Sequence, residues 1–179
     1  MTETPLEQET VQQETVRAYV CLGSNDARAA GMLARARRRM ERLPDMRPGA
    51  VSPVYRTEPQ ERRRQAWFLN QAVELLPGDS WNPPNLLKAL LDIELKLGRV
   101  RSPAVGRFGP RVIDADLLLY GNERSSCAEC LLPHPRMVRR AFALVPLLDI
   151  APDICIDGVR AATWLACLNY RVERNRIFQ

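Results

Sequence analysis

The sequence predicts one α+β domain that follows a short acidic tail, and three observations support this. Short apolar, β-branched or aromatic runs alternate with stretches in which apolar residues recur at helical spacing, as in a chain that mixes strands and amphipathic helices. The 179 residues are 46% hydrophobic and 26% charged, which is an ordinary globular composition. Residues 1–16 carry glutamates but no apolar periodicity, so we expect a flexible tail there and a single domain over residues 17–179.

The first half of this domain predicts a strand and then a helix. Residues 17–22 (RAYVCL) are short and partly β-branched, and they end at Gly23. Asp26 is a suitable N-cap for the helix that follows, and Pro44 limits its other end. Its apolar face consists of Leu33, Ala36, Met40 and Leu43, and arginines occupy the opposite face.

Two further strands are expected next, over residues 51–57 and 67–76, and they would pair as a hairpin with a long charged connection. Pro53 lies inside the first of them, which indicates an edge position or a bulge, because proline cannot donate a ladder hydrogen bond.

The second half predicts a helix, a loop and a strand, followed by short elements. Asn82 and the two prolines after it form a helix start signal, and Gly98 ends the helix. Its apolar face consists of Leu86, Leu90, Ile93 and Leu97. The aperiodic residues 99–111 predict a loop, and residues 112–120 (VIDADLLLY) predict a strand. Short helices broken by prolines and a small helix over 161–168 complete the chain.

The predicted order is therefore β-α-β-β-α-β with a C-terminal extension of short elements. This is the ferredoxin-like pattern, which implies an antiparallel sheet with both long helices on one face. Many unrelated functions use this fold, so the chemistry has to be argued from particular residues.

Charge and cysteine content narrow the class of protein. The net charge is +5, and 24 of the 26 basic residues are arginine, which suits phosphate-bearing partners such as a nucleotide or nucleic acid. A general preference for arginine would explain the same composition, and both interpretations stay open. The start of the chain lacks the pattern of a signal peptide, no apolar stretch is long enough to span a membrane, and the five cysteines are scattered. We therefore expect a cytoplasmic protein with free thiols and no membrane partner.

The most informative local feature is Asp114-Ala115-Asp116 inside an otherwise apolar strand. Side chains at i and i+2 of a strand share a face, so these two carboxylates would repel each other unless a cation lies between them. Mg²⁺ prefers such hard oxygen ligands together with substrate phosphates. The alternative is a pair of solvated aspartates at a sheet edge.

An arginine-rich loop comes directly before this strand. Carboxylate-bound magnesium beside arginines is the set of groups that phosphoryl transfer uses, because both neutralise phosphate charge. The alternative is a solvated basic loop. Neither a Walker A motif nor a kinase-type glycine loop occurs in the chain. The arginines of the loop are Arg99, Arg101, Arg107 and Arg111.

Several separated motifs in this order resemble the 6-hydroxymethyl-7,8-dihydropterin pyrophosphokinase family of folate biosynthesis. The resemblance covers roughly residues 17–154. The motifs are Tyr19…Leu22-Gly23-Ser24-Asn25, Ser52-x-x-Tyr55-Arg56-Thr57, Phe68-Leu69-Asn70, Glu94…Gly98-Arg99-Val100-Arg101, Arg107-Phe108-Gly109-Pro110-Arg111-x-Ile113-Asp114-x-Asp116, Pro133-His134 and Arg140-x-Phe142-x-Leu144-x-Pro146-Leu147.

The resemblance implies an enzyme that transfers pyrophosphate from ATP to the hydroxymethyl group of the pterin and releases AMP. It implies that Asp114 and Asp116 hold two Mg²⁺ ions and act in catalysis with Arg99 and Arg111. The implied ATP contacts are Glu94, Arg101, Arg107, Leu117, His134 and Arg140. The implied pterin contacts are Thr57 and Asn70, with the rings of Phe68 and Phe142 on the two faces of the pterin. We expect a monomer that binds no nucleic acid.

The alternative function is an arginine-rich RNA-binding module on the same ferredoxin-like topology. Such modules carry an RNP1-like aromatic string, which this chain lacks, and an aspartate pair without metal would repel RNA phosphates.

Overall fold

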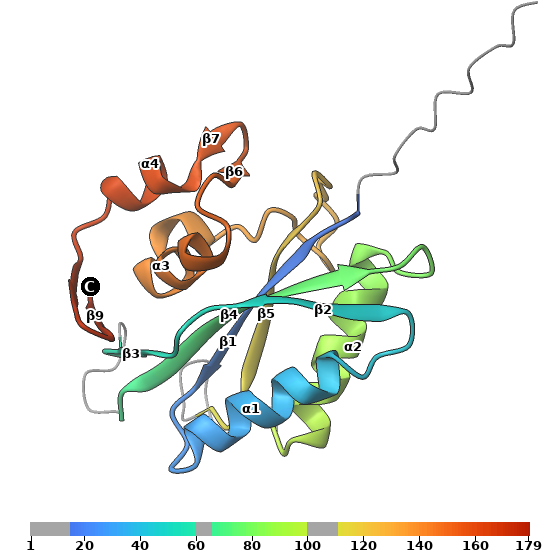
Figure 1. The fold of residues 1–179 in the computed structure, drawn as a ribbon, viewed down its shortest axis with the longest axis horizontal. Helices are drawn as coiled ribbons and strands as arrows, with labels where there is room; N and C mark the ends of the chain where they lie inside the picture. The colour runs from blue at the N-terminus through green and yellow to red at the C-terminus, as the bar shows by residue number, and fades with distance from the viewer. Residues whose placement is uncertain (1–14, 60–65, 100–110) are drawn as a thin grey trace, which may run out of the picture.

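The computed structural model describes residues 15–59, 66–99 and 111–179, which form a mixed α/β fold around a seven-stranded sheet (Figure 1). The strands of this sheet are β1 (Ala18–Ser24), β2 (Met46–Val51), β3 (Tyr55–Thr57), β4 (Phe68–Pro77), β5 (Asp114–Tyr120), β8 (Arg171–Glu173) and β9 (Arg176–Phe178). The helices are α1 (Ala29–Met40), α2 (Pro83–Lys96), the 3₁₀ turn η2 (Met137–Arg139), α3 (Ala141–Ile150) and α4 (Ala161–Ala166). A small separate hairpin joins β6 (Cys155–Ile156) to β7 (Val159–Arg160).

The sheet is mixed, so the expectation of an antiparallel sheet is wrong in one respect. Its order is β5-β1-β4-β3-β9-β8, and β2 pairs with β4 beside β3. The pairs of β1 with β4 and β5, and of β4 with β2 and β3, are antiparallel, whereas β9 runs parallel to β3. Strands β8 and β9 are only three residues long, too short for an apolar alternation that the sequence could reveal.

Helices cover both faces of the sheet, and alternate residues of β1 pack to opposite sides. Ala18, Val20 and Leu22 share a hydrophobic cluster with the apolar residues of α1 and α2, so both long helices lie on one face as expected. Tyr19 and Cys21 belong to the other cluster, which includes residues of α3 and α4. Figure 1 shows these two helices on the side of the sheet away from α1 and α2. Within the described ranges, every helix is too short or too polar to cross a lipid bilayer.

The predicted strand over residues 51–57 is confirmed only in its second half, as β3, because β2 covers Met46–Val51 and includes just one residue of that range. β2 ends at Val51 and β3 begins at Tyr55, and both pair with β4. Ser52 still bonds Ala72 through its backbone N–H at 3.0 Å, but Pro53 has no N–H to continue the ladder. The proline therefore marks a break between two strands.

Two predicted helix signals also differ from the structure. The N-cap of α1 is Arg28, and the Asp26 side chain, two residues earlier, accepts the backbone N–H of Arg28 at 2.8 Å. Pro146 was expected to break a helix, yet it lies buried inside α3. The start of α2 is as predicted, because the Asn82 side chain accepts the backbone N–H of Asn85 and Pro83 follows it.

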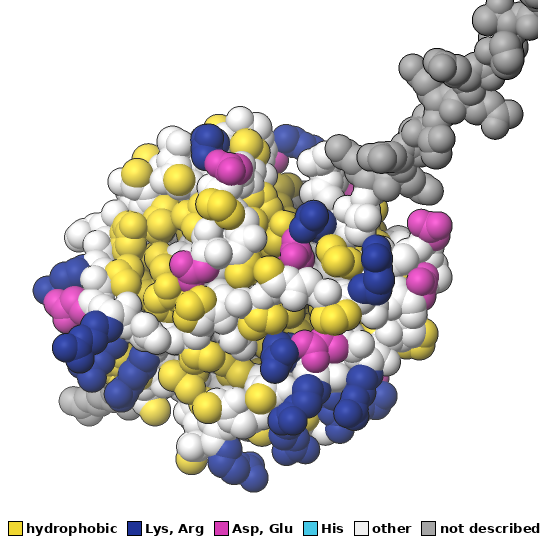
Figure 2. Space-filling model, in the orientation of Figure 1, with side chains coloured by type: hydrophobic (Ala, Val, Ile, Leu, Met, Phe, Trp, Pro, Cys, Tyr) yellow, Lys and Arg dark blue, Asp and Glu magenta, His cyan; other side chains and the backbone are white. Residues whose placement is uncertain are grey.

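The arginine-rich composition is partly explained by α1. Figure 2 shows dark blue side chains gathered over this helix, where Arg35, Arg38 and Arg39 are exposed. These arginines lie on the solvent face of α1, opposite its buried residues, so they account for charge without forming part of the aspartate cluster.

Candidate active site

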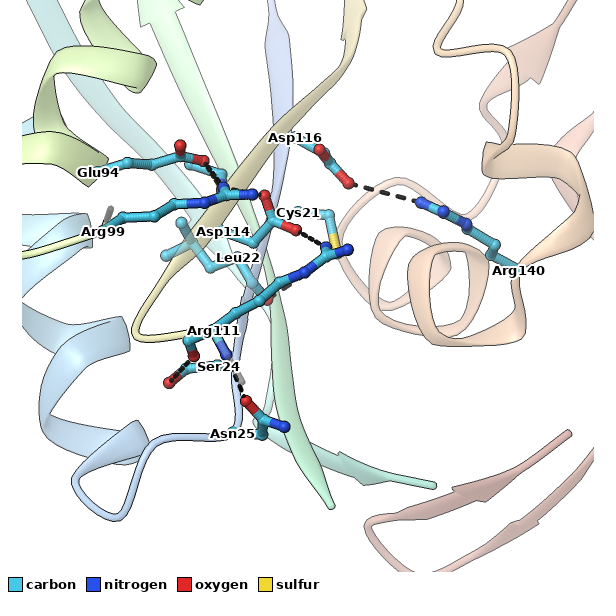
Figure 3. Close-up of polar contacts among 11 residues, drawn as sticks. Cys21, Leu22, Ser24, Asn25, Glu94, Arg99, Arg111, Asp114, Asp116 and Arg140 are labelled. Carbon is cyan, nitrogen blue, oxygen red and sulfur yellow. Dashed lines mark hydrogen bonds and ion pairs between the residues drawn. The ribbon is translucent and has the colours of Figure 1, made fainter. Parts of the chain in front are cut away.

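The two aspartates lie on one face of β5, the strand at one end of the sheet, which pairs with β1 (Figure 3). Asp114 is opposite Gly23 and Asp116 is opposite Cys21 in the antiparallel register. Arginines reach this pair from both sides, with Arg99 following α2 and Arg140 preceding α3. Strand β5 thus holds the two carboxylates in place, and arginines from other parts of the chain pair with them.

Asp114 is held by two arginines, one on each carboxylate oxygen. Its Oδ1 lies 2.5 Å from Arg99 Nη1, and its Oδ2 pairs with Arg111 Nη1. Burial by itself would raise the pKa of Asp114, but the charges of Arg99 and Arg111 and their hydrogen bonds outweigh it, so the pKa lies below its ordinary value. Asp114 is therefore a stable carboxylate.

Glu94 positions Arg99 and the start of β5. Its side chain, on α2, is 2% exposed, and its Oε1 accepts from Arg99 Nη1 at 2.5 Å and from the backbone N–H of Ala115 at 2.8 Å. Glu94 thereby directs the guanidinium of Arg99 toward Asp114. The resemblance implies an ATP contact for Glu94, and that contact stays a prediction.

Asp116 has much weaker compensation for its charge. The nearest cationic atom among its ion pairs is Arg140 Nη1, 3.6 Å from Oδ2. Burial, followed by the charge of Asp114, raises the pKa of Asp116 to about 6, although Arg140 opposes this. A carboxylate in this situation would gain from a cation beside it.

The aspartate pair has the donor chemistry that Mg²⁺ requires, because both groups offer hard oxygen ligands on one face. Each carboxylate oxygen has two lone pairs, so an oxygen of Asp114 that accepts from an arginine can still approach a cation. No group of three or more histidine, cysteine, aspartate or glutamate side chains in the described residues could hold a metal by itself. Oxygens from a substrate or water would have to complete the coordination.

Ser24, the last residue of β1, and Asn25, which follows it, fix the backbone of Arg111 and Val112. Asn25 Oδ1 accepts the backbone N–H of Arg111 at 2.7 Å, and the backbone N–H of Asn25 donates to the Arg111 carbonyl at 3.2 Å. Ser24 Oγ donates to the Val112 carbonyl at 2.7 Å. Both residues belong to a motif of the resemblance, but their role in the site could not be predicted. Their partners lie more than 80 positions later in the chain, and no local pattern indicates such contacts.

The expected pterin residues lie on the α3 side of the sheet. Asn70 is buried on β4, and its Nδ2 donates to Thr57 Oγ1 at 2.6 Å. Phe68 is two residues earlier on β4 and half-buried, so it shares a face with Asn70 as expected. Phe142, in the first turn of α3, is half-buried, and the guanidinium carbon of Arg140 lies 5.3 Å from its ring centroid.

His134 is held beside β5 in a defined protonation state. Its backbone N–H donates to the Leu118 carbonyl at 2.9 Å, and its Nδ1 accepts the backbone N–H of Arg136 at 3.2 Å. Burial, and then the charges of Arg140 and Arg136, lowers the pKa of His134 to about 4. The ring is therefore neutral at pH 7, with its proton on Nε2.

Of the expected residues that the structure describes, Leu117 is not part of this cluster. Leu117 is 3% exposed and lies in the core under α1 and α2. Arg101 and Arg107 lie outside the described residues.

Comparison with known proteins agrees with the resemblance. Residues 19–152 match the model of the family described as 7,8-dihydro-6-hydroxymethylpterin-pyrophosphokinase (HPPK). Three curated proteins named 2-amino-4-hydroxy-6-hydroxymethyldihydropteridine pyrophosphokinase are similar to the chain. The one from Methylorubrum extorquens is 44% identical over 86% of this chain and 94% of its own, and the one from Pseudomonas aeruginosa is 42% identical over 88% and 96%. The one from Bacillus subtilis is 37% identical over 82% and 84%.

Solved structures give the same fold at low sequence identity. A structure described as HPPK-DHPS in complex with substrates superposes with a TM-score of 0.59 at 13% identity, over 85% of this chain and 43% of that chain. Wild-type Plasmodium falciparum HPPK-DHPS with STZ-DHP gives 0.61 at 12% identity, over 88% and 44%. This chain thus spans less than half of those longer proteins. Because the family model covers most of the chain and the curated relatives align over nearly their full length, the chain belongs to the HPPK family.

Proposed function

We propose that this protein transfers the pyrophosphoryl group of ATP to the hydroxymethyl group of 6-hydroxymethyl-7,8-dihydropterin, with release of AMP, in folate biosynthesis. Membership of the HPPK family supports this reaction. The observation that carries it is the pair Asp114 and Asp116 on one face of β5, with Arg99, Arg111 and Arg140 directed at it. Carboxylates that can hold a cation next to several guanidinium groups suit the transfer of a highly charged phosphate chain.

Asp114 and Asp116 would hold Mg²⁺, two ions by the resemblance, so the enzyme is proposed to depend on magnesium. When bound, the ions neutralise phosphate charge and align the ATP chain. Arg99 and Arg111 would stabilise the charge that develops on the transferred group, and both are pre-positioned, by Glu94 and Asn25 respectively. Fixed donors of this kind need little reorganisation during the transfer.

Arg140 and the Nε2–H of neutral His134 are proposed as ATP contacts, because both lie beside β5 on the side of Asp116. A neutral imidazole N–H can donate to a phosphate or ribose oxygen, and its charge does not change with pH near pH 7. Leu117, Arg101 and Arg107 remain proposed ATP contacts on the resemblance alone. Glu94 also remains a proposed ATP contact on the resemblance, and its bond to Arg99 supports a second role in holding that guanidinium.

The pterin is proposed to lie against Asn70 and Thr57, between the rings of Phe68 and Phe142. The position of Asn70 and Phe68 on one face of β4 supports this, since a flat heterocycle needs an aromatic surface and edge hydrogen bonds together. Because Asn70 donates to Thr57, its Oδ1 is oriented as an acceptor for a pterin N–H.

We further propose that residues 17–179 act as one ferredoxin-like domain, and as a monomer in the cytoplasm without a nucleic-acid partner. The antiparallel β5-β1-β4 core, with α1 and α2 on one face, supports the ferredoxin-like interpretation. The RNA-binding alternative has no support from the family or the relatives.

The test is to incubate the protein with ATP, MgCl₂ and 6-hydroxymethyl-7,8-dihydropterin and to measure AMP. Pterin-dependent AMP formation that chelation of Mg²⁺ abolishes is the expected result. Asp92→Asn is a matched control, because Asp92 is exposed on α2 and forms an ion pair with Lys96 one helical turn away. Production of ADP, or AMP formation without the pterin, would contradict the proposal.

A further inference from the structure

Helix α3 begins without a side-chain cap from its own N-cap residue. That residue is Arg140, with extended backbone angles of φ −129° and ψ 103°. The first N–H groups of a helix lack partners within the helix, and Ser, Thr, Asn or Asp at the N-cap normally accepts one of them. Arginine has only donors, so it cannot do this. If Arg140 is to face Asp116, the cap of α3 has to come from elsewhere in the chain.

Gln179 supplies this cap from a distant part of the chain. Its Oε1 accepts the backbone N–H of Ala141 at 2.8 Å, and its Nε2 donates to the Arg139 carbonyl at 2.9 Å. One amide side chain thus binds the peptide groups immediately before and after Arg140. From this clamped position the Arg140 guanidinium lies 3.6 Å from Asp116 Oδ2 and over the ring of Phe142.

Gln179 is itself anchored to the strand that carries an expected pterin contact. Its backbone N–H donates to Glu58 Oε1 at 2.8 Å. The preceding strand β9 pairs with β3, where Ile177 is opposite Thr57 and 1% exposed. The clamp on Arg140 is therefore connected through β9 to β3, which pairs with β4 and its Asn70.

We infer that Gln179 is a positioning residue for ATP binding, which acts by fixing the backbone of Arg140 so that its guanidinium faces Asp116. The inference rests on the proposed function, in which Arg140 contacts ATP. Gln179 lies beyond residues 19–152, the part that matches the family model, so that match assigns it no role. Gln179 also lies outside every motif on which the resemblance depends, so the sequence pattern gave no reason to assign it a role.

The experiment measures the affinity of a non-hydrolysable ATP analogue with MgCl₂ by calorimetry, and KM values for ATP and the pterin. Gln179→Ala should weaken ATP binding about threefold to tenfold, the size expected from one or two lost hydrogen bonds. KM for ATP should rise more than KM for the pterin. Gln179→Glu, which keeps an acceptor for the Ala141 N–H, should recover part of the affinity.

Two comparisons distinguish positioning of Arg140 by Gln179 from a general loosening of the β8–β9 pair. Ile177→Val is the matched control, since it removes one buried methyl from β9 but leaves the clamp, and it should keep the wild-type ATP affinity. In an Arg140→Ala background, Gln179→Ala should cause little further loss, because the group that it positions is gone. Wild-type affinity in Gln179→Ala, or an equal loss in both backgrounds, would overturn the inference. A wild-type protein that makes no AMP would instead refute the proposed function, while the calorimetric comparison would still decide the role of Gln179.

Discussion

Asp114 and Asp116 are the same residue type two positions apart, yet their surroundings give them opposite properties. Asp114 has an arginine on each oxygen and a lowered pKa. Asp116 has one more distant arginine, and burial beside Asp114 raises its pKa to about 6. The first carboxylate stabilises the folded protein, whereas the second is an electrostatic cost that a bound cation would relieve.

Asp116→Asn should therefore make the ligand-free protein more stable at pH 7. The pKa of Asp116 is about 6 in the folded state against 3.8 unfolded, so the folded state loses stability as pH rises from about 4 through 6. With allowance for solvent screening, we expect a gain of about 1–2 kcal/mol at pH 7 that shrinks below pH 5. Urea unfolding at both pH values measures it, and a variant less stable than wild type at pH 7 would refute this assignment.

Asp114→Asn should have the opposite effect on stability. It leaves Arg99 and Arg111 without their shared carboxylate, and both guanidinium groups are partly desolvated. Removing one partner of such a network is expected to cost about 2 kcal/mol or more at pH 7. The same urea series provides the measurement, and equal stability of the two asparagine variants would show that their surroundings do not differ as described.

The sequence could predict the carboxylate pair and the arginines near it, but not the contacts that hold those arginines in place. The i, i+2 spacing puts Asp114 and Asp116 on one face of any strand. Arg99 was expected near them by resemblance, but its bond to buried Glu94 depends on the length and direction of α2. The Gln179 contact joins residues 38 positions apart through a flexible side chain, and no local pattern encodes that.

At the scale of elements, the pairing of β1 with β4 places the Asn70 side chain against Gly23, beside the expected pterin site. Gly23 is opposite Asn70, and a Cβ at Gly23 would lie 2.9 Å from Asn70 Oδ1. Gly23→Ala should therefore displace the Asn70 side chain and raise KM for the pterin by about tenfold, roughly the loss of one or two hydrogen bonds. Steady-state kinetics with each substrate varied tests this. A larger rise in KM for ATP than for the pterin would argue against this placement of Asn70.

Helix α2 and the small helix α4 were predictable from local patterns, whereas β2, β8 and β9 were not. α2 carries its cap, its apolar stripe and its terminal glycine in the local sequence, so its bounds followed from helical rules. β8 and β9 exist because they pair with each other and with β3, not because three residues prefer an extended conformation. The sheet is mixed because β9 pairs with β3 in parallel, and the prediction of an antiparallel sheet is wrong at this pair.

At the scale of the whole molecule, the candidate site draws on helices that cover opposite faces of the sheet. Arg99 extends from the end of α2, and Arg140 lies at the start of α3, with β5 between them (Figure 3). This convergence assembles positive charge around two carboxylates only when both layers are packed. The site is therefore a property of the complete fold, although most of its residues could be identified from motifs in the sequence.

The central claim is that the aspartate pair on β5 is the centre of pyrophosphoryl transfer, and a single-turnover experiment tests it most directly. Enzyme in excess over labelled ATP is mixed with MgCl₂ and the hydroxymethyl pterin, and AMP and pterin pyrophosphate are measured after rapid quenching. We predict equal amounts of both products for wild type and Asp92→Asn, and a rate at least ~10²-fold lower for Asp116→Asn, the size expected when a group that stabilises transition-state charge is lost. A folded Asp116→Asn protein that forms both products at the wild-type rate would contradict the account.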